Sequence, residues 1–169
     1  MSTYAVLATG PSMSQAVVNS VRSLPTVAVS DAWTLAPHAV ALVSSDKAWW
    51  DVHSEAHAFE GRKFCASSVI VPGVESLPGT SGCNSGLLAV RVALHLGAER
   101  VLLLGFDMHG EHFFGRHPEP LKNSEPRHFD RFRRQFDGWA VPNGREIINC
   151  TPGSKLDTYP HKTLAEVLL

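Results

Sequence analysis

Histidine is the side chain in this sequence best suited to proton transfer, and nine histidines occur in 169 residues. His128 stands at the start of a predicted helix, directly after a long polar segment. An imidazole in such a place can reach a bound substrate and accept a proton from it. We therefore predict that His128 is a general base.

Other histidines and acids are close enough in sequence to raise the question of a metal site. His53 and His57 are four residues apart on a predicted helix, and a second group follows one strand, namely Asp107, His109, Glu111, His112 and His117. The first pair has no third ligand nearby, and the second group fits no HExxH-type spacing. We interpret His53 and His57 as surface or packing residues and expect no metal ion.

A run of small residues, Gly79 to Gly86 with the sequence GTSGCNSG, is suited to anion binding. Few side chains obstruct its backbone N–H groups, and a helix is predicted to begin there and reach Leu96. Free N–H groups and the positive end of a helix dipole favour a phosphate. The run therefore indicates a nucleotide cradle formed by Thr80, Ser81, Gly82 and Asn84. A tight loop that needs glycine for its turns is the alternative.

The turn Thr9-Gly10-Pro11-Ser12 has the same character and follows the first predicted strand. Gly10 allows close backbone approach, Pro11 suits a first helical turn, and Ser12 can cap free N–H groups. A strand, a tight turn and a helix open a doubly wound fold. The turn is thus a second part of the cradle, or simply a helix cap.

Small polar residues follow each of the other predicted strands, at Ser30 and Asp31, at Asp46, at Asp107, and at Thr151 and Ser154. The carboxyl ends of parallel strands meet at one edge of a sheet, where ligands bind. We expect these residues to form a binding rim, with Asp31 accepting a hydrogen bond from a ribose hydroxyl. Capping of the following segments by Asp31 and Asp46 is the alternative.

The elements that must position these residues alternate between strand and helix patterns. Strands are predicted at Tyr4 to Ala8, Thr26 to Val29, Ala39 to Val43, Phe64 to Val71, Val101 to Leu104 and Glu146 to Cys150. Helices are predicted after Ser12, over Lys47 to Phe59, Leu87 to Leu96 and Arg127 to Asp137, and from about His161. This order predicts a single α/β domain over residues 1–169, with three α/β/α layers, a mainly parallel sheet of about six strands and a Rossmann-like arrangement.

Residues 107–127 form a long polar segment just beyond a central strand, where lids are commonly found. The helix that follows carries an apolar stripe of phenylalanines and a basic stripe formed by Arg127, Arg131 and Arg134. This basic stripe can attract a phosphate or an acidic substrate, or it can simply be a solvated face.

Composition narrows the class of protein. With 44% hydrophobic and 18% charged residues and a net charge of −1, the chain is expected to be globular, with no membrane-spanning segment and without nucleic acid as a partner. Three cysteines without zinc-type spacing predict free thiols. The start of the sequence lacks the pattern of a signal peptide, and we therefore expect a cytoplasmic protein. A homo-oligomer is compatible with this expectation.

Four short motifs together resemble a known family. They are Ala8-Thr9-Gly10-Pro11-Ser12, Thr80-Ser81-Gly82, Leu104-Gly105-Phe106-Asp107, and Ile148-Asn149-Cys150-Thr151-Pro152-Gly153-Ser154. In this order the chain is similar to the bacterial sialyltransferases of glycosyltransferase family 42 and to a related group of phage and prophage proteins. It is more distantly similar to the domain family that includes archaeal hydroxymethylpterin pyrophosphokinase.

The resemblance implies a metal-independent enzyme whose nucleotide is a substrate rather than a cofactor, possibly a CMP-linked sugar. It implies that Gly10, Ser12, Thr80, Ser81 and Gly82 hold the nucleotide, together with Ser30, Asp31 and Asp46. It also implies a histidine base just before a helix, which is the position of His128, with His117 as the competing candidate.

These observations predict a nucleotide-dependent transferase, most simply a glycosyltransferase with an unidentified acceptor. A non-catalytic nucleotide-binding accessory protein, perhaps encoded by a phage, is one alternative. A pterin-type pyrophosphokinase that requires ATP and magnesium is another.

Overall fold

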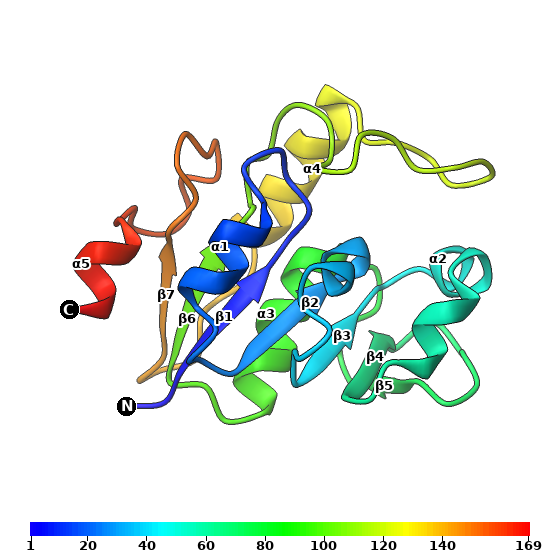
Figure 1. The fold of residues 1–169 in the computed structure, drawn as a ribbon, viewed down its shortest axis with the longest axis horizontal. Coiled ribbons are helices and arrows are strands. Elements are labelled where there is room, and N and C mark those ends of the chain that lie inside the picture. Colours follow the sequence, from blue (N-terminus) through cyan, green and yellow to red (C-terminus); the bar gives the residue numbers. More distant parts are fainter.

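Seven parallel strands form one sheet in the order β5-β4-β3-β2-β1-β6-β7 (Figure 1). The structure is a computed structural model that describes residues 1–169. The strands are β1 (Thr3–Leu7), β2 (Thr26–Val29), β3 (Ala41–Val43), β4 (Arg62–Ala66), β5 (Glu75–Leu77), β6 (Arg100–Leu104) and β7 (Glu146–Asn149). The predicted α/β fold with a parallel sheet is confirmed, and the sheet has one strand more than the six expected.

Helices cover both faces of this sheet. They are α1 (Gln15–Ser20), α2 (Lys47–Val52), α3 (Ser85–His95), α4 (Pro126–Asp137) and α5 (Leu164–Leu168), with short 3-10 helices η1 (Ser30–Thr34) and η2 (Ser54–Ala58). Figure 1 shows α1 on one side of the sheet and α3 on the other. The molecule therefore has three layers, as the alternation of sequence patterns predicted.

Alternation along the strands divides the core in two. In β1, Val6 packs on the face that α3 covers, while Leu7 packs on the face that α1, η1 and α2 cover. Phe136 of α4 belongs to the α3 side, and Trp50 of α2 to the other. Because both faces are buried, the central strands are continuous aliphatic runs rather than alternating ones.

The direction in which the chain builds the sheet reverses at β1. Strands β2 to β5 are added on one side of β1, and the chain then crosses back through α3 to place β6 and β7 on the other side. In register, Leu7 of β1 lies opposite Leu104 of β6. Such a reversal leaves a crevice at the carboxyl ends of the two strands, and ligands commonly bind there.

Four local predictions differ from the structure. The strand expected over Phe64 to Val71 begins at Arg62 and ends at Ala66. No strand was predicted between Val71 and the run that begins at Gly79, yet Glu75–Leu77 pairs with β4 as the edge strand β5. The helix expected over 47–59 ends at Val52, because His53 leaves the helical conformation, and 3-10 helix η2 follows. His53 and His57 therefore do not share a helix face. The last helix begins at Leu164 rather than His161, with Thr163 as its N-cap.

None of the helices combines the length and the apolar character that a membrane crossing needs.

Candidate functional site

A cleft with a volume of about 860 Å³ opens at the carboxyl edge of the sheet, where β1 and β6 separate. Its floor is formed by the segments that follow β1, β2, β3 and β6 and by the start of α3. Its walls come from α4, from the start of α2, and from residues of the segment 107–125, which we call the lid. Figure 1 shows the lid extending from the top of β6 toward the side of α2 before the chain enters α4.

Gly10 and Asp107 pack directly against each other in the floor of the cleft. The Asp107 side chain, only 3% exposed, accepts hydrogen bonds from the Ser12 hydroxyl at 2.8 Å and from the Ser12 backbone N–H at 3.3 Å. A Cβ atom on Gly10 would lie 2.0 Å from Asp107 Oδ2, so only glycine fits. The predicted anion position of the Gly10-Pro11-Ser12 turn is therefore filled by a carboxylate of the chain itself. Pro11 is exposed and does not line the cleft.

The start of α3 is more open. Asn84 is its N-cap and accepts a hydrogen bond from the Leu87 N–H at 3.0 Å, while its own backbone N–H donates to Gln135 of α4 at 2.7 Å. The N–H groups of Ser85 and Gly86 have no partner in the chain. Gly82, Asn84, Ser85 and Gly86 all line the cleft, so the predicted phosphate position at this helix end faces the open space.

Besides Pro11, Ser12 and Asp31, four more predicted nucleotide-binding residues do not line the cleft. Thr80 is fully buried and ties the β5–α3 loop to Ser67, and Ser81 is exposed on the surface. Thr151 accepts a hydrogen bond from the Phe106 N–H, and the Ser154 hydroxyl donates to the Phe106 carbonyl. Thr151 and Ser154 therefore hold the loop after β6 in place and do not face the cleft.

The rim residues after β2 and β3 have separate environments. Ser30 lines the cleft in a left-handed conformation, with φ of 46°, and its hydroxyl donates to Ser44 at 3.3 Å. Asp46 also lines the cleft and is exposed, and its side chain makes no capping hydrogen bond to α2. Asp31 turns instead toward α2 and the lid.

Asp31 is the centre of a polar cluster that the sequence patterns did not predict. Its Oδ2 accepts a hydrogen bond from the Trp49 indole N–H at 3.0 Å, and its Oδ1 lies 3.0 Å from His53 Nε2. The other His53 nitrogen, Nδ1, lies 3.0 Å from the Trp49 carbonyl oxygen. His117 completes the cluster, with its Nδ1 at 3.6 Å from Asp31 Oδ2.

The lid is held against the body of the protein by backbone and histidine contacts. The Phe113 N–H donates to the Thr9 carbonyl at 2.9 Å, and His112 Nδ1 lies 2.8 Å from the Thr9 hydroxyl. The His112 and His117 rings lie 4.5 Å apart. The lid thus brings two histidines against residues that follow β1 and β2.

Burial dominates the protonation of His112 and His117. Loss of water lowers the pKa of His112, and the nearby His117 lowers it further, against the attraction of Asp31. Burial likewise lowers the pKa of His117, while Asp31 raises it and His53 lowers it. Both imidazoles are therefore neutral at neutral pH, the form in which histidine accepts a proton.

His128 lies in the cleft wall at the first turn of α4, but one of its ring nitrogens is engaged. The backbone N–H of Glu125 donates to His128 Nδ1 at 2.9 Å. Because Nδ1 accepts this bond, the proton of the neutral ring is on Nε2, and the remaining nitrogen is a donor. The base role predicted for His128 stays a prediction, and it requires the Glu125 bond to break.

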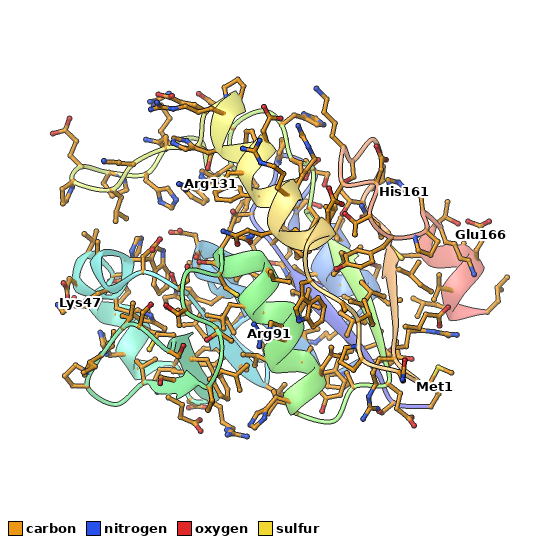
Figure 2. The ribbon with its side chains drawn as sticks, turned by 180° about the vertical axis from the view of Figure 1, so that it is seen from behind. Met1, Lys47, Arg91, Arg131, His161 and Glu166 are labelled. Atoms are coloured by element: carbon orange, nitrogen blue, oxygen red, sulfur yellow. The ribbon has the colours of Figure 1, made fainter.

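The remaining cleft wall of α4 combines cations and aromatic rings. Arg131 forms no ion pair, and its guanidinium lies 5.7 Å from the centre of the Phe132 ring. Phe129 and Gln135 line the cleft beside it, and Lys122 of the lid lies on the same wall. Figure 2 shows Arg131 on α4 and Lys47 at the start of α2, two of the cations that line the cleft. Lys47 is already paired with Asp51 at 2.6 Å.

Several of these cleft residues had no sequence signal that pointed to the site. Trp49, Lys122, Phe129 and Phe132 carry ordinary helix or loop patterns, and His53 was interpreted as a packing residue. No group of three His, Cys, Asp or Glu side chains is placed to hold a metal ion. Comparison of the chain with protein-family models, with curated proteins and with solved structures finds no match.

Proposed function

We propose that the protein is a nucleotide-dependent transferase, which binds a nucleotide-linked donor in the cleft and transfers a group from it to an acceptor hydroxyl. The simplest form is a glycosyltransferase with a nucleotide-sugar donor, such as a CMP-linked sugar. The observation that carries the proposal is the position of the cleft at the reversal point of a parallel sheet, where the free N–H groups of α3 open into it.

The phosphate position in this proposal is the start of α3. The Ser85 and Gly86 N–H groups have no partner, and the helix dipole adds positive potential at the same point. The Gly10 turn is not available for this purpose, because Asp107 occupies it. A phosphate therefore binds at α3 and keeps away from the Asp107 carboxylate.

The wall of α4 supports the rest of the ligand. Arg131 has no acidic partner and can neutralise a second phosphate or an acidic sugar. Phe129 and Phe132 offer ring faces or edges for a nucleobase. His128, with its proton on Nε2, can donate a hydrogen bond to the departing phosphate.

The transfer itself needs a base for the acceptor hydroxyl. The acceptor oxygen forms a bond to the transferred carbon while the bond from that carbon to the phosphate oxygen breaks. The phosphate leaves with the electron pair, and the acceptor proton passes to a histidine. A well-placed base contributes about 100- to 10,000-fold in rate.

Ligand-induced thermal stabilisation tests the proposal. The panel contains CMP, CDP, UDP, GDP, ADP, ATP and S-adenosylmethionine, each with and without magnesium. A ligand present at about 100 times its dissociation constant adds about 2.7 kcal/mol to the free energy of unfolding. We expect one nucleotide to stabilise the protein and Arg131→Gln to reduce the shift. Arg91→Gln is the matched control, because Arg91 lies on α3 but bonds the Gly79 carbonyl outside the cleft. No shift with any nucleotide contradicts the proposal.

A non-catalytic nucleotide-binding protein is the second candidate, and the engagement of His128 Nδ1 by Glu125 favours it. The two are separated by product formation: a transferase releases the free nucleotide from its donor in the presence of an acceptor or, slowly, of water, while a binding protein returns the donor intact. A requirement for magnesium and ATP would instead indicate the pyrophosphokinase alternative.

A further inference from the structure

We infer that Asp31 and His117 act as a carboxylate–histidine pair, in which His117 is the general base and Asp31 is the residue that positions it. The inference rests on the proposed function, because it names the base of the proposed transfer. The lid carries the base, and Asp31, in η1 after β2, is the carboxylate that orients it.

The geometry of the pair selects one tautomer of His117. Its Nδ1 is buried, has no hydrogen-bond partner within usual limits, and lies 3.6 Å from Asp31 Oδ2. A lone pair at Nδ1 would face the carboxylate, whereas an N–H would be attracted to it. The neutral ring therefore carries its proton on Nδ1, which leaves the lone pair of Nε2 free to accept a proton. The distance is long for a hydrogen bond, as is common for catalytic contacts before substrate binds.

Asp31 is held firmly enough to orient a neighbour. The Trp49 indole N–H binds Oδ2 and His53 Nε2 lies at 3.0 Å from Oδ1, so both carboxylate oxygens have a partner besides His117. Both nitrogens of His53 face oxygen acceptors, since Nδ1 lies beside the Trp49 carbonyl. His53 therefore connects the Trp49 carbonyl to the Asp31 carboxylate.

The lid determines whether His117 reaches this carboxylate. His117 belongs to the lid, and its backbone N–H donates to Asn123 across the lid at 2.7 Å. The contacts of Phe113 and His112 with Thr9 hold the same segment against the end of β1. His117 lines the cleft from the lid, and His128 lines it from α4, together with His109 and His112 of the lid.

The two histidines then have complementary forms. His117 has its free lone pair on Nε2, and His128 has its proton on Nε2. In the transfer, His117 Nε2 takes the acceptor proton, and the resulting imidazolium keeps its Nδ1–H toward Asp31, whose negative charge stabilises it. The leaving phosphate accepts a hydrogen bond from His128. The step involves no change of oxidation state, and its charges balance without a metal ion.

The first experiment needs no substrate. Long-range proton–nitrogen NMR distinguishes the two neutral imidazole tautomers, and His117→Gln identifies the His117 signals. We expect the Nδ1–H form in the wild-type protein and a shift toward the Nε2–H form in Asp31→Asn. Asp46→Asn is the matched control, because Asp46 is also a carboxylate of the cleft rim but has no contact with His117. An Nε2–H form in the wild type, or no change in Asp31→Asn, overturns the inference.

The second experiment uses the donor found by thermal shift. His117→Gln and Asp31→Asn are expected to lower kcat by about 100-fold or more with little change in KM. The acid limb of the rate against pH should move to lower pH in Asp31→Asn, because the lost negative charge no longer raises the pKa of His117. The other titratable groups that face His117 are His53 and His112, and both remain in the variant. An unchanged kcat, or a limb that moves to higher pH, overturns the inference.

The failure of the pair and the failure of the proposed function give different results. Wild-type NMR signals of the Nδ1–H type that depend on Asp31, without any nucleotide binding, would support the pair and contradict the nucleotide proposal. Nucleotide binding and turnover with an Nε2–H form of His117 would contradict the pair alone.

Discussion

Asp107 is the residue that most changes the interpretation of the β1 turn. Its place after a predicted strand made Asp107 an expected member of the binding rim. It instead receives the Ser12 N–H and hydroxyl, and this contact joins segments 95 residues apart in sequence. The turn thus binds an anion, as its residue types indicate, but the anion is part of the protein.

Gly10→Ala tests how closely this contact is packed. The added Cβ would lie 2.0 Å from Asp107 Oδ2 and 2.5 Å from the Gly105 carbonyl oxygen, which is backbone and cannot easily move. We expect a loss of at least about 2 kcal/mol in the free energy of unfolding, measured by urea denaturation.

Gly138→Ala is the control for that substitution. Gly138 follows α4 with φ of −82°, which any residue adopts, and an added Cβ would lie 3.3 Å from its nearest atom, the Arg134 carbonyl oxygen. The control should stay within about 1 kcal/mol of wild type. Equal effects of the two substitutions would contradict the close contact between Gly10 and Asp107.

At the scale of elements, we predict that docking of the lid depends on pH. Its docking buries His112 and His117 in their neutral forms, and burial lowers the pKa of each below the ordinary histidine value of about 6.5. Above that value the docked and undocked lids bind the same number of protons, so the free energy of docking is at its most favourable. As pH falls from there toward the lowered pKa values, the undocked lid takes up protons that the docked lid excludes.

Hydrogen exchange of the Phe113 amide measures this effect, because this amide donates to Thr9 when the lid is docked. We expect its protection factor, corrected for the intrinsic rate, to fall between about pH 7.5 and about pH 5. The fall should approach tenfold for each pKa unit of lowering, since one unit corresponds to about 1.4 kcal/mol.

The Ala8 amide is the internal reference for that experiment. It donates to the Leu104 carbonyl inside the sheet and makes no contact with the lid histidines. Its protection should change much less over the same pH range. Protection at Phe113 that is constant or that rises on acidification would show that lid docking does not depend on neutral histidines.

At the scale of the whole molecule, a single sheet connects the two hydrophobic clusters. Adjacent residues of one strand belong to different clusters: Leu103 packs on the α3 side of the sheet and Leu102 on the opposite side. Neither cluster can therefore lose its packing while the other keeps an intact sheet. This architecture predicts one cooperative unfolding transition.

Tryptophan fluorescence can follow the two sides separately. Trp49 and Trp50 pack on the α2 side, whereas Trp139 packs against the α3 side. We expect far-UV circular dichroism, wild-type fluorescence and the fluorescence of Trp139→Phe to give the same urea midpoint. Separate midpoints would show that the two sides of the sheet unfold independently.

The sequence by itself determined the class of the fold and most of its elements. Residues 101–104 of β6 are all aliphatic because both faces of the strand are buried there, and α3 begins at a small-residue turn with Asn84 as its cap. These signals are local, since hydrophobic period, turn residues and caps act within a few residues. The edge strand β5 was not predicted, because only one of its three residues is buried and the segment has no strand-like hydrophobic pattern. Its backbone pairing with β4 holds it in the sheet.

Only the tertiary structure decided which polar residues meet. Thr80, Thr151 and Ser154 are the same kinds of residue as those that line the cleft, yet they bind loop backbone. The cluster of Asp31, His53 and His117 combines the ends of different elements with the lid. The physical reason is that strand order and lid docking bring together residues distant in the chain, and neither residue type nor spacing records that arrangement.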